Sequence, residues 1–507
     1  MTTDLLATYP LDQDYTFPRN AGCQSDFVEV DSTLADWDEA YDAAKGRGRG
    51  ESSKHGAIVF TEVRCPSQTK ADRQPRIQYK PSCSVWRLAL AFCHSVKAVN
   101  HSDRLFDLIP SRLGRNRTID LAAAAFYKAS EYRQQQTLTT QKQYQKSYAA
   151  ALEAVRRSIE CGNANCADEV VIPTILLGAT VCTEPAEDKV GLWIYIRGAS
   201  ALILNARNSN PQDEPASELT RVALYVGWIA TFADPIFRRS PSPFEEVHWL
   251  NMEPPKVYAT VPDAIRLRIL GNELFIRLPR LVAAVRDLRD GRSSSAVYST
   301  ALRLARHLLL LNDPASESHL LHRLKIKRTV HPVDRLVVPY SFEFPEHQFY
   351  EAAVYYWATQ TVLNRLCLQL CTLNPPDQPP ANIFSRNLSL QNLSFASNLL
   401  MAMTYATGLG RLGSYPMYIG GIALWGVVHD CGTKLKNTPV SLVRPLVIRM
   451  YGELVVRSFR KNIDTFCAVE MDAAVDMLAG GPQSELLTEI FCWNPQSYGA
   501  GKPPGCA

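Results

Sequence analysis

GLWIYIRGASALILNAR, the stretch from Gly191 to Arg207, is the most strongly apolar part of the chain that still has the pattern of a helix in a soluble protein. Its apolar side chains recur at spacings of three and four residues, the period of a helix face turned toward a core: Leu192, Ile196, Ala199, Ile203 and Ala206. Few side chains remain for water: Arg197, Ser200, Asn205 and Arg207. This pattern predicts a helix buried among other helices, and not an active site.

Small side chains lie in the middle of this stretch, where they allow a neighbouring helix to approach closely. The residues that mark this candidate central packing helix are Trp193, Arg197, Gly198 and Ala199. Because a larger side chain would overpack the contact, replacing Gly198 by leucine is expected to destabilise the protein by about 1–3 kcal/mol.

The chain as a whole has the composition of a folded, soluble protein, with 507 residues, 46% of them apolar and 21% charged. This length exceeds what one hydrophobic core usually serves, so two or three packing units in one large body are expected. The net charge of +4 is too small to favour a general nucleic-acid-binding surface.

Cysteine usage and the first residues favour an intracellular protein. The 13 cysteines are spread over the whole length, and the start MTTDLLATYP has neither the basic residues nor the apolar core of a secretion signal. Free thiols in a cytosolic or nuclear protein are therefore expected. The best uncharged apolar run, Val170 to Cys182, is too short to span a bilayer, and no membrane contact is predicted.

The first 43 residues are acidic, with ten Asp and Glu residues against one basic residue, Arg19. Between Asp26 and Asp42, apolar side chains are interleaved with carboxylates, a composition typical of acidic-hydrophobic activation segments. The candidate activation surface is formed by Phe27, Leu34, Trp37 and Tyr41. The alternative is that these side chains dock on the protein's own core.

A glycine-rich basic run, Lys45 to Lys54, follows the acidic segment and is typical of a solvated linker. We expect residues 1–80 to form this acidic and then basic arm, partly disordered. Residues 81–480 should form the helical body, and residues 481–507 a short helix and a flexible tail.

Helical patterns dominate the body and predict an all-α fold, a large multi-helix body of packed helical hairpins. The segments with the strongest helical spacing are 84–99, 119–136, 142–160, 170–182, 266–289, 349–373, 394–430, 440–466 and 471–478. The helix over 142–160 should end near Cys161, because Gly162 and Asn163 supply a C-terminal stop.

One short run has the spacing of a dinucleotide-binding loop. GLGRLG, Gly408 to Gly413, is followed about twenty residues later by Asp430. The motif functions where a strand turns into a helix, whereas the residues before Gly408 have a helical pattern. A loop between two packed helices is therefore expected, and no cofactor is predicted.

No metal site or catalytic motif is predicted, and the chain is not expected to be an enzyme. The cysteine pairs, Cys161 with Cys166 and Cys367 with Cys371, lack a second pair of ligands at a suitable spacing. The basic run from Arg323 to Arg328, near His319 and His322, is expected to be a solvated face.

Four sequence blocks follow one another along the chain: AAAAFYKASEY with YAAALEAVRRSI, then WIYIRGASALILNAR, FYEAAVYYWATQTVLNRLCL, and LLMAMTYATGLGRLGSYPMYIGGIALWGV. This order resembles the regulatory middle region of the fungal zinc-cluster transcription factors, the fungal-specific transcription factor domain. WIYIRGASALILNAR is the best single match, being similar to the family's aromatic or histidine, apolar pair, Gly-Ala, leucines and arginine. The resemblance covers about four fifths of the chain.

The chain departs from this family at the DNA-binding module. The family has an N-terminal cluster of six cysteines that binds zinc, whereas the cysteines in the first hundred residues here are far apart: Cys23, Cys65, Cys83 and Cys93. No zinc ligand carries over, and direct DNA binding is not expected. The chain is then a regulator that lost the module, the product of a gene model without its first exon, or a helical domain used for another purpose.

The resemblance implies a transcriptional regulator or coregulator of a fungal metabolic or secondary-metabolite gene cluster, located in the nucleus or in both nucleus and cytoplasm. Its partners would be the transcription machinery or a zinc-cluster transcription factor, and a small-molecule effector and a homodimer are left open. In the alternative, the helical body binds a metabolite, with or without converting it, in a cavity lined by Trp193, Trp228, Trp357 and Trp425. The favoured interpretation of these tryptophans is that they are core aromatics.

Overall fold

The computed structural model divides the chain into two units, residues 1–56 and 57–507, and the residues that it describes belong to the second. The described residues are 87–93, 106, 108–160, 167–183, 191–209, 232–245, 261–292, 295–373, 385–409, 414–432, 434–435, 438–458 and 466–490. The predicted acidic arm lies outside them.

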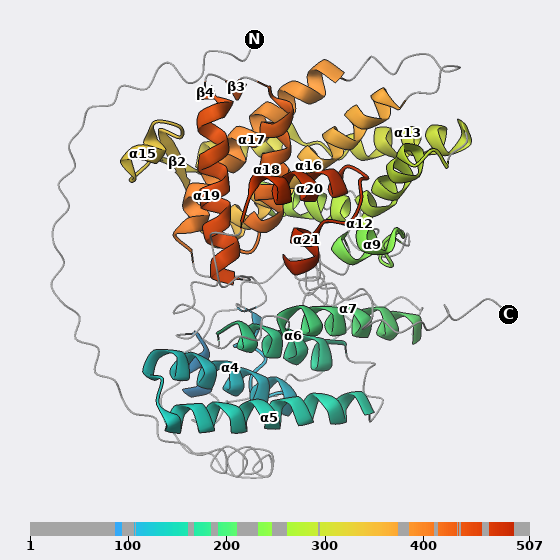
Figure 1. The fold of residues 1–507 in the computed structure, drawn as a ribbon. Helices are drawn as coiled ribbons and strands as arrows, with labels where there is room; N and C mark the ends of the chain where they lie inside the picture. Colours follow the sequence, from blue (N-terminus) through green and yellow to red (C-terminus); the bar gives the residue numbers. More distant parts are fainter. Residues whose placement is uncertain are drawn as a thin grey trace, which may run out of the picture. The chain divides into compact units, whose positions relative to one another are not determined.

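Helices make up nearly all of the regular structure (Figure 1). They are α4 (Arg117–Gln135), α5 (Leu138–Glu160), α6 (Ala167–Thr183), α7 (Gly191–Ser209), α9 (Asp234–Arg238), α12 (Asp263–Arg289), α13 (Ser295–Leu309), α14 (Pro314–Arg323), α15 (Pro332–Arg335), α16 (His347–Thr372), α17 (Ser385–Thr407), α18 (Met417–Asp430), α19 (Val440–Ser458), α20 (Ala468–Leu478) and α21 (Glu485–Ile490). In the described ranges, strands form two antiparallel pairs: β1 (Lys325–Arg328) with β2 (Tyr340–Glu343), and β3 (Lys434–Leu435) with β4 (Thr438–Pro439). The predicted all-α fold is confirmed.

The consecutive helices α4 to α7 pack against one another. The side chain of Asn116 begins α4 by accepting hydrogen bonds from the N–H groups of Thr118 (2.7 Å) and Ile119 (3.1 Å). α4 packs against α5 and α6, and α6 packs against α7. α5 ends at Glu160, next to the predicted stop at Cys161.

α16 is the helix around which the later elements pack. It contacts α12, α13, α14, α17 and α18, and nearly every residue between Phe349 and Leu366 is buried. Its sequence contains polar residues that would be costly to bury without partners. Thr359 and Thr361 donate to the carbonyls four residues earlier (2.8 and 2.7 Å), and Asn364 donates to Asn392 (3.0 Å). From Phe349 to Asn364 this helix is therefore buried on all sides.

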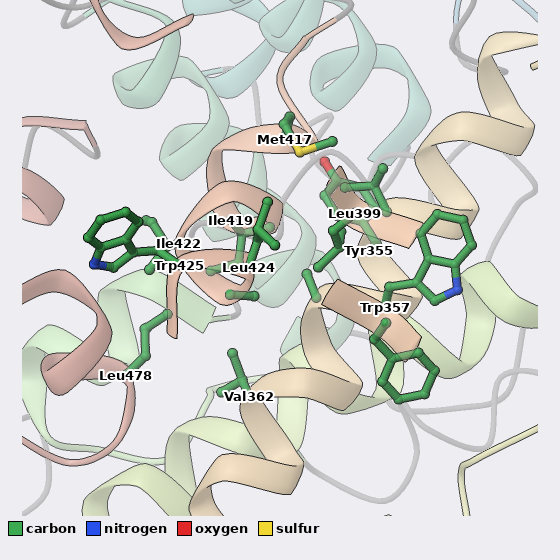
Figure 2. Close-up of a cluster of buried hydrophobic side chains, with 14 of the residues drawn as sticks. Tyr355, Trp357, Val362, Leu399, Met417, Ile419, Ile422, Leu424, Trp425 and Leu478 are labelled. Atoms are coloured by element: carbon green, nitrogen blue, oxygen red, sulfur yellow. The ribbon is translucent and has the colours of Figure 1, made fainter. Parts of the chain in front are cut away.

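α18 approaches its neighbours through glycines. Figure 2 shows its side chains Ile419, Ile422, Leu424 and Trp425 in one buried cluster with residues of α16, α17 and α20. A Cβ atom on Gly420 would lie 2.8 Å from Val354 Cγ1, and one on Gly421 would overlap the ring of Tyr451 from α19. Only glycine allows contacts this close.

α7 is less central than its sequence pattern predicted. Ile196, Ala199 and Ile203 are buried, as expected for the core face. Ile194, which follows Trp193 in the broad apolar pattern, is 58% exposed, while Ser200, expected to face water, is buried. Ser200 lies four residues after Ile196 and three before Ile203, so the helical period places it on the buried face despite its polar side chain, whereas Ile194 lies off that face.

Two further expectations for α7 are corrected by its contacts. Arg197 does not face water but forms a two-bond ion pair with Asp234 of α9, with both N···O distances at 2.7 Å. A Cβ atom on Gly198 would lie 3.9 Å from Thr174 Cγ2 of α6, which is an ordinary contact. The neighbouring helix is present, but the tight packing expected at Gly198 is found at Gly421 instead.

Candidate interaction surface

The β1–β2 hairpin, residues 325–343, lies at the edge of the helical body beside α17 and α19 (Figure 1, yellow). It follows α14 directly and precedes α16. Its antiparallel register pairs Lys325 with Glu343 and Arg328 with Tyr340. The sequence predicted the exposure of the basic run in β1 but not the strand, because four residues are too few for a clear alternating pattern.

β2 is the inner strand and anchors the hairpin in the core. Phe342 stacks on Trp357 of α16 with 5.9 Å between ring centroids, and Phe344 meets Tyr405 of α17 edge-on at 5.0 Å. Phe342 and Phe344 are almost fully buried. Aromatic pairs of this geometry stabilise beyond their buried area, so the hairpin has a fixed attachment to the body.

The segment that joins the two strands is held by hydrogen bonds at its base. Thr329 is buried, its N–H donates to Pro339 O (3.0 Å), and its hydroxyl donates to Val338 O. Arg335 donates to Thr329 O (2.9 Å), and the buried carboxylate of Asp334 pairs with Arg449 of α19. The connection, with α15 inside it, is thus an ordered part of the surface.

Exposed apolar side chains gather on this hairpin. They are Ile326, Val330, Val333, Leu336 and Tyr340, with exposed fractions between 44% and 89%. All four residues of β1 are exposed, and three of them are the cations Lys325, Lys327 and Arg328. Apolar side chains concentrated on an exposed surface among charges are typical of a protein-contact site.

A buried polar cluster lies next to the hairpin, on the other side of Trp357, between α14, α16 and α17. Glu317 accepts hydrogen bonds from Trp357 Nε1 (2.8 Å) and Asn398 Nδ2 (3.2 Å). Burial raises the pKa of Glu317 to about 7, and the two hydrogen bonds oppose that rise. Tyr356 binds the start of α14 through Asn312 and the N–H of Asp313. The cluster fixes α14 on α16.

The candidate activation surface, Phe27, Leu34, Trp37 and Tyr41, lies outside the described residues. So do the side chain of Trp193, all of Trp228 and the pair Cys161 and Cys166.

The described residues place the start of the glycine run, Gly408, and the acidic residue that follows it, Asp430. Gly408 follows the end of α17, and α18 begins at Met417, so the run lies between two helices that pack together, as predicted. Asp430 forms an ion pair with Arg365 of α16 (2.8 Å).

The cysteine pair on α16 has no feature of a reactive or metal-binding site. Burial raises the pKa of the Cys367 thiol to about 12 and also raises that of Cys371, so both are protonated near neutral pH. In the described ranges, no group of His, Cys, Asp and Glu side chains has the arrangement of a metal site. His319 lies 3.5 Å from Asp263, and His322 contacts Ser318 O (2.6 Å).

The interior next to Trp425 is closely packed. Trp357 and Trp425 are fully buried in the cluster of Figure 2. A hollow between α16, α18 and α20, lined by Val362, Arg365 and Leu478 among others, has a volume of about 10 Å³. Such a volume accommodates about one water molecule. Trp357 and Trp425 themselves belong to the main hydrophobic cluster.

Comparison of the chain with models of protein families, with curated proteins and with solved structures gives no match. Among the described helices, none combines the length and the apolar character needed to cross a membrane.

Proposed function

We propose that this chain is a transcriptional regulator or coregulator, of a fungal metabolic or secondary-metabolite gene cluster, whose helical body acts through protein contacts. The observation that best supports this proposal is the β1–β2 hairpin, an ordered element of the body that exposes five large apolar side chains among cations. A surface of this kind suits contact with another protein.

The resemblance of the helical blocks in the sequence supports the same proposal. The blocks that resemble the fungal-specific transcription factor domain lie within α4, α5, α7, α16, α17 and α18. In this proposal the acidic arm contacts the transcription machinery, a zinc-cluster factor supplies the DNA binding, and the protein works in the nucleus.

A reporter assay tests this function. The full chain is fused to a heterologous DNA-binding domain, and Phe27, Leu34, Trp37 and Tyr41 are replaced by alanine together. Since apolar side chains among carboxylates make the contact in activation segments of this composition, activation should be lost.

The matched control replaces four polar residues of the same arm by alanine: Thr16, Asn20, Gln24 and Ser25. This control should activate as well as the parent. Equal activation by the parent and by the variant without the four apolar side chains would overturn the assignment of the activation surface, and no activation by the parent fusion would overturn activation as the function.

A further inference from the structure

β1 has an open edge along which its backbone groups are free to pair. The Thr329 N–H donates to Pro339 O, and the same register pairs Lys327 with Ser341. Hydrogen-bonded pairs alternate along an antiparallel ladder, so the peptide groups of Ile326 and Arg328 point away from β2. All of β1 is exposed, and in the described part of the chain these outward groups have no hydrogen-bond partner.

The charges along this edge select the kind of strand that could pair with it. Lys327 pairs with Glu343, whereas Lys325 and Arg328 have no carboxylate partner within the described ranges. Like charges placed opposite each other destabilise a strand pair, so the cations oppose pairing with a second copy of β1. An acidic strand would instead be attracted.

We propose that β1 binds an acidic, apolar segment of a partner protein, which adds to the hairpin as an extended third strand. Backbone hydrogen bonds to Ile326 and Arg328 hold the segment, and its alternate carboxylates lie on the same face as Lys325 and Lys327. Its apolar side chains cover the exposed apolar residues of the hairpin. This inference rests on the proposed function, because it names the partner of the same surface.

The open backbone edge favours a peptide over other anionic partners. A lipid surface or a nucleic acid supplies negative charge, but neither offers the alternating N–H and C=O groups that complete a strand ladder. Binding that depends on the backbone of Ile326 therefore distinguishes a peptide strand from a partner attracted by charge alone.

The test uses the purified full chain and a fluorescent synthetic peptide of alternating glutamate and valine, with binding followed by anisotropy. Ile326→Pro removes an outward N–H and leaves the ladder to β2 intact, because proline is tolerated where the N–H of an edge strand faces solvent. It should weaken binding at least about tenfold, whereas Ile326→Ser, which keeps the N–H, should weaken it by about threefold.

A charge reversal and its matched control complete the design. Lys325→Glu should weaken binding by about fivefold, whereas Arg303→Glu, at an exposed position of α13, should leave it unchanged. Thermal melting checks that Ile326→Pro stays folded. If that variant does not fold, the ratio between the affinities of Lys325→Glu and Arg303→Glu, together with the loss in Ile326→Ser, decides the result.

Three outcomes would overturn the inference. They are unchanged peptide binding by a folded Ile326→Pro variant, equal binding of a lysine–valine peptide, and binding of phosphatidylserine vesicles but not of the acidic peptide. The peptide assay needs no transcription, so its failure leaves the reporter result standing. A failed reporter assay with intact peptide binding would in turn overturn only the proposed function.

Discussion

Glu317 is a side chain whose charge depends on the fold. It belongs to the short helix α14, yet its hydrogen-bond donors, Trp357 and Asn398, come from α16 and α17. Burial raises its pKa from the usual 4.5 to about 7. The folded protein then holds this proton more tightly than the unfolded chain, so the free energy of unfolding falls as the pH rises from about 4.5 to about 7.

Glu317→Gln should remove this pH dependence, because glutamine still accepts the bond from Trp357 but does not ionise. The difference in the free energy of unfolding between the variant and the parent should increase in favour of the variant as the pH rises from 5 to 8. The expected increase is about 1–2 kcal/mol, after allowance for the partial exposure of the side chain. Urea unfolding at both pH values measures the difference.

Trp357→Phe serves as the comparison for Glu317→Gln. It removes a hydrogen-bond donor to Glu317 but keeps the ionisable carboxyl group. The free energy of unfolding should therefore be lower by about 1 kcal/mol, and it should still fall as the pH rises. A parent and a Glu317→Gln variant with the same pH dependence of unfolding would show that this carboxyl group titrates normally.

At the scale of helices, two glycines with similar sequence surroundings differ in how closely the neighbouring helix approaches them. Gly198 in α7 and Gly421 in α18 both lie within apolar helical patterns. The space at Gly198 holds a Cβ atom, whereas the ring of Tyr451, fixed by its hydrogen bond to Tyr418 O (2.9 Å), fills the space at Gly421. Periodicity places a residue on a helix face but does not reveal how close the next helix lies.

Alanine at these two positions should have opposite effects. Gly198→Ala should stabilise the protein by about 0.5–1 kcal/mol, since alanine has the higher helix propensity and meets no clash. Gly421→Ala should destabilise it by about 1–3 kcal/mol, because the ring of Tyr451 must move. Denaturant unfolding of the two variants side by side is the measurement, and a Gly421→Ala variant as stable as Gly198→Ala would contradict the close approach of α18 and α19.

For the whole molecule, the boundary predicted after residue 480 does not separate the C-terminal segment from the core. Leu486, Leu487 and Ile490 of α21 belong to the main hydrophobic cluster. The buried guanidinium of Arg286 in α12 donates to Gly481 O (3.0 Å) and to Ile236 O (3.1 Å). The predicted short helix exists, but it completes the body.

A chain that ends at Gly480 should therefore be much less stable than a chain that ends at Asn494. The shorter chain loses three fully buried side chains, each of which stabilises by about 1.5–3 kcal/mol, and leaves a buried charge without one of its acceptors. Thermal unfolding of both truncations checks this. Equal melting temperatures would restore the boundary at residue 480.

The helical class and most helix positions were determined by the sequence itself, because apolar spacing, caps and stops act within a few residues of one another. The exposure of the basic run in β1 followed in the same way. Only the tertiary structure decided that α16 and not α7 lies at the centre, that Asp430 pairs with Arg365, and that the hairpin presents a free edge. These features depend on partners far apart in the chain: a polar residue can be buried, or a glycine required, only where another element supplies the matching group or fills the space.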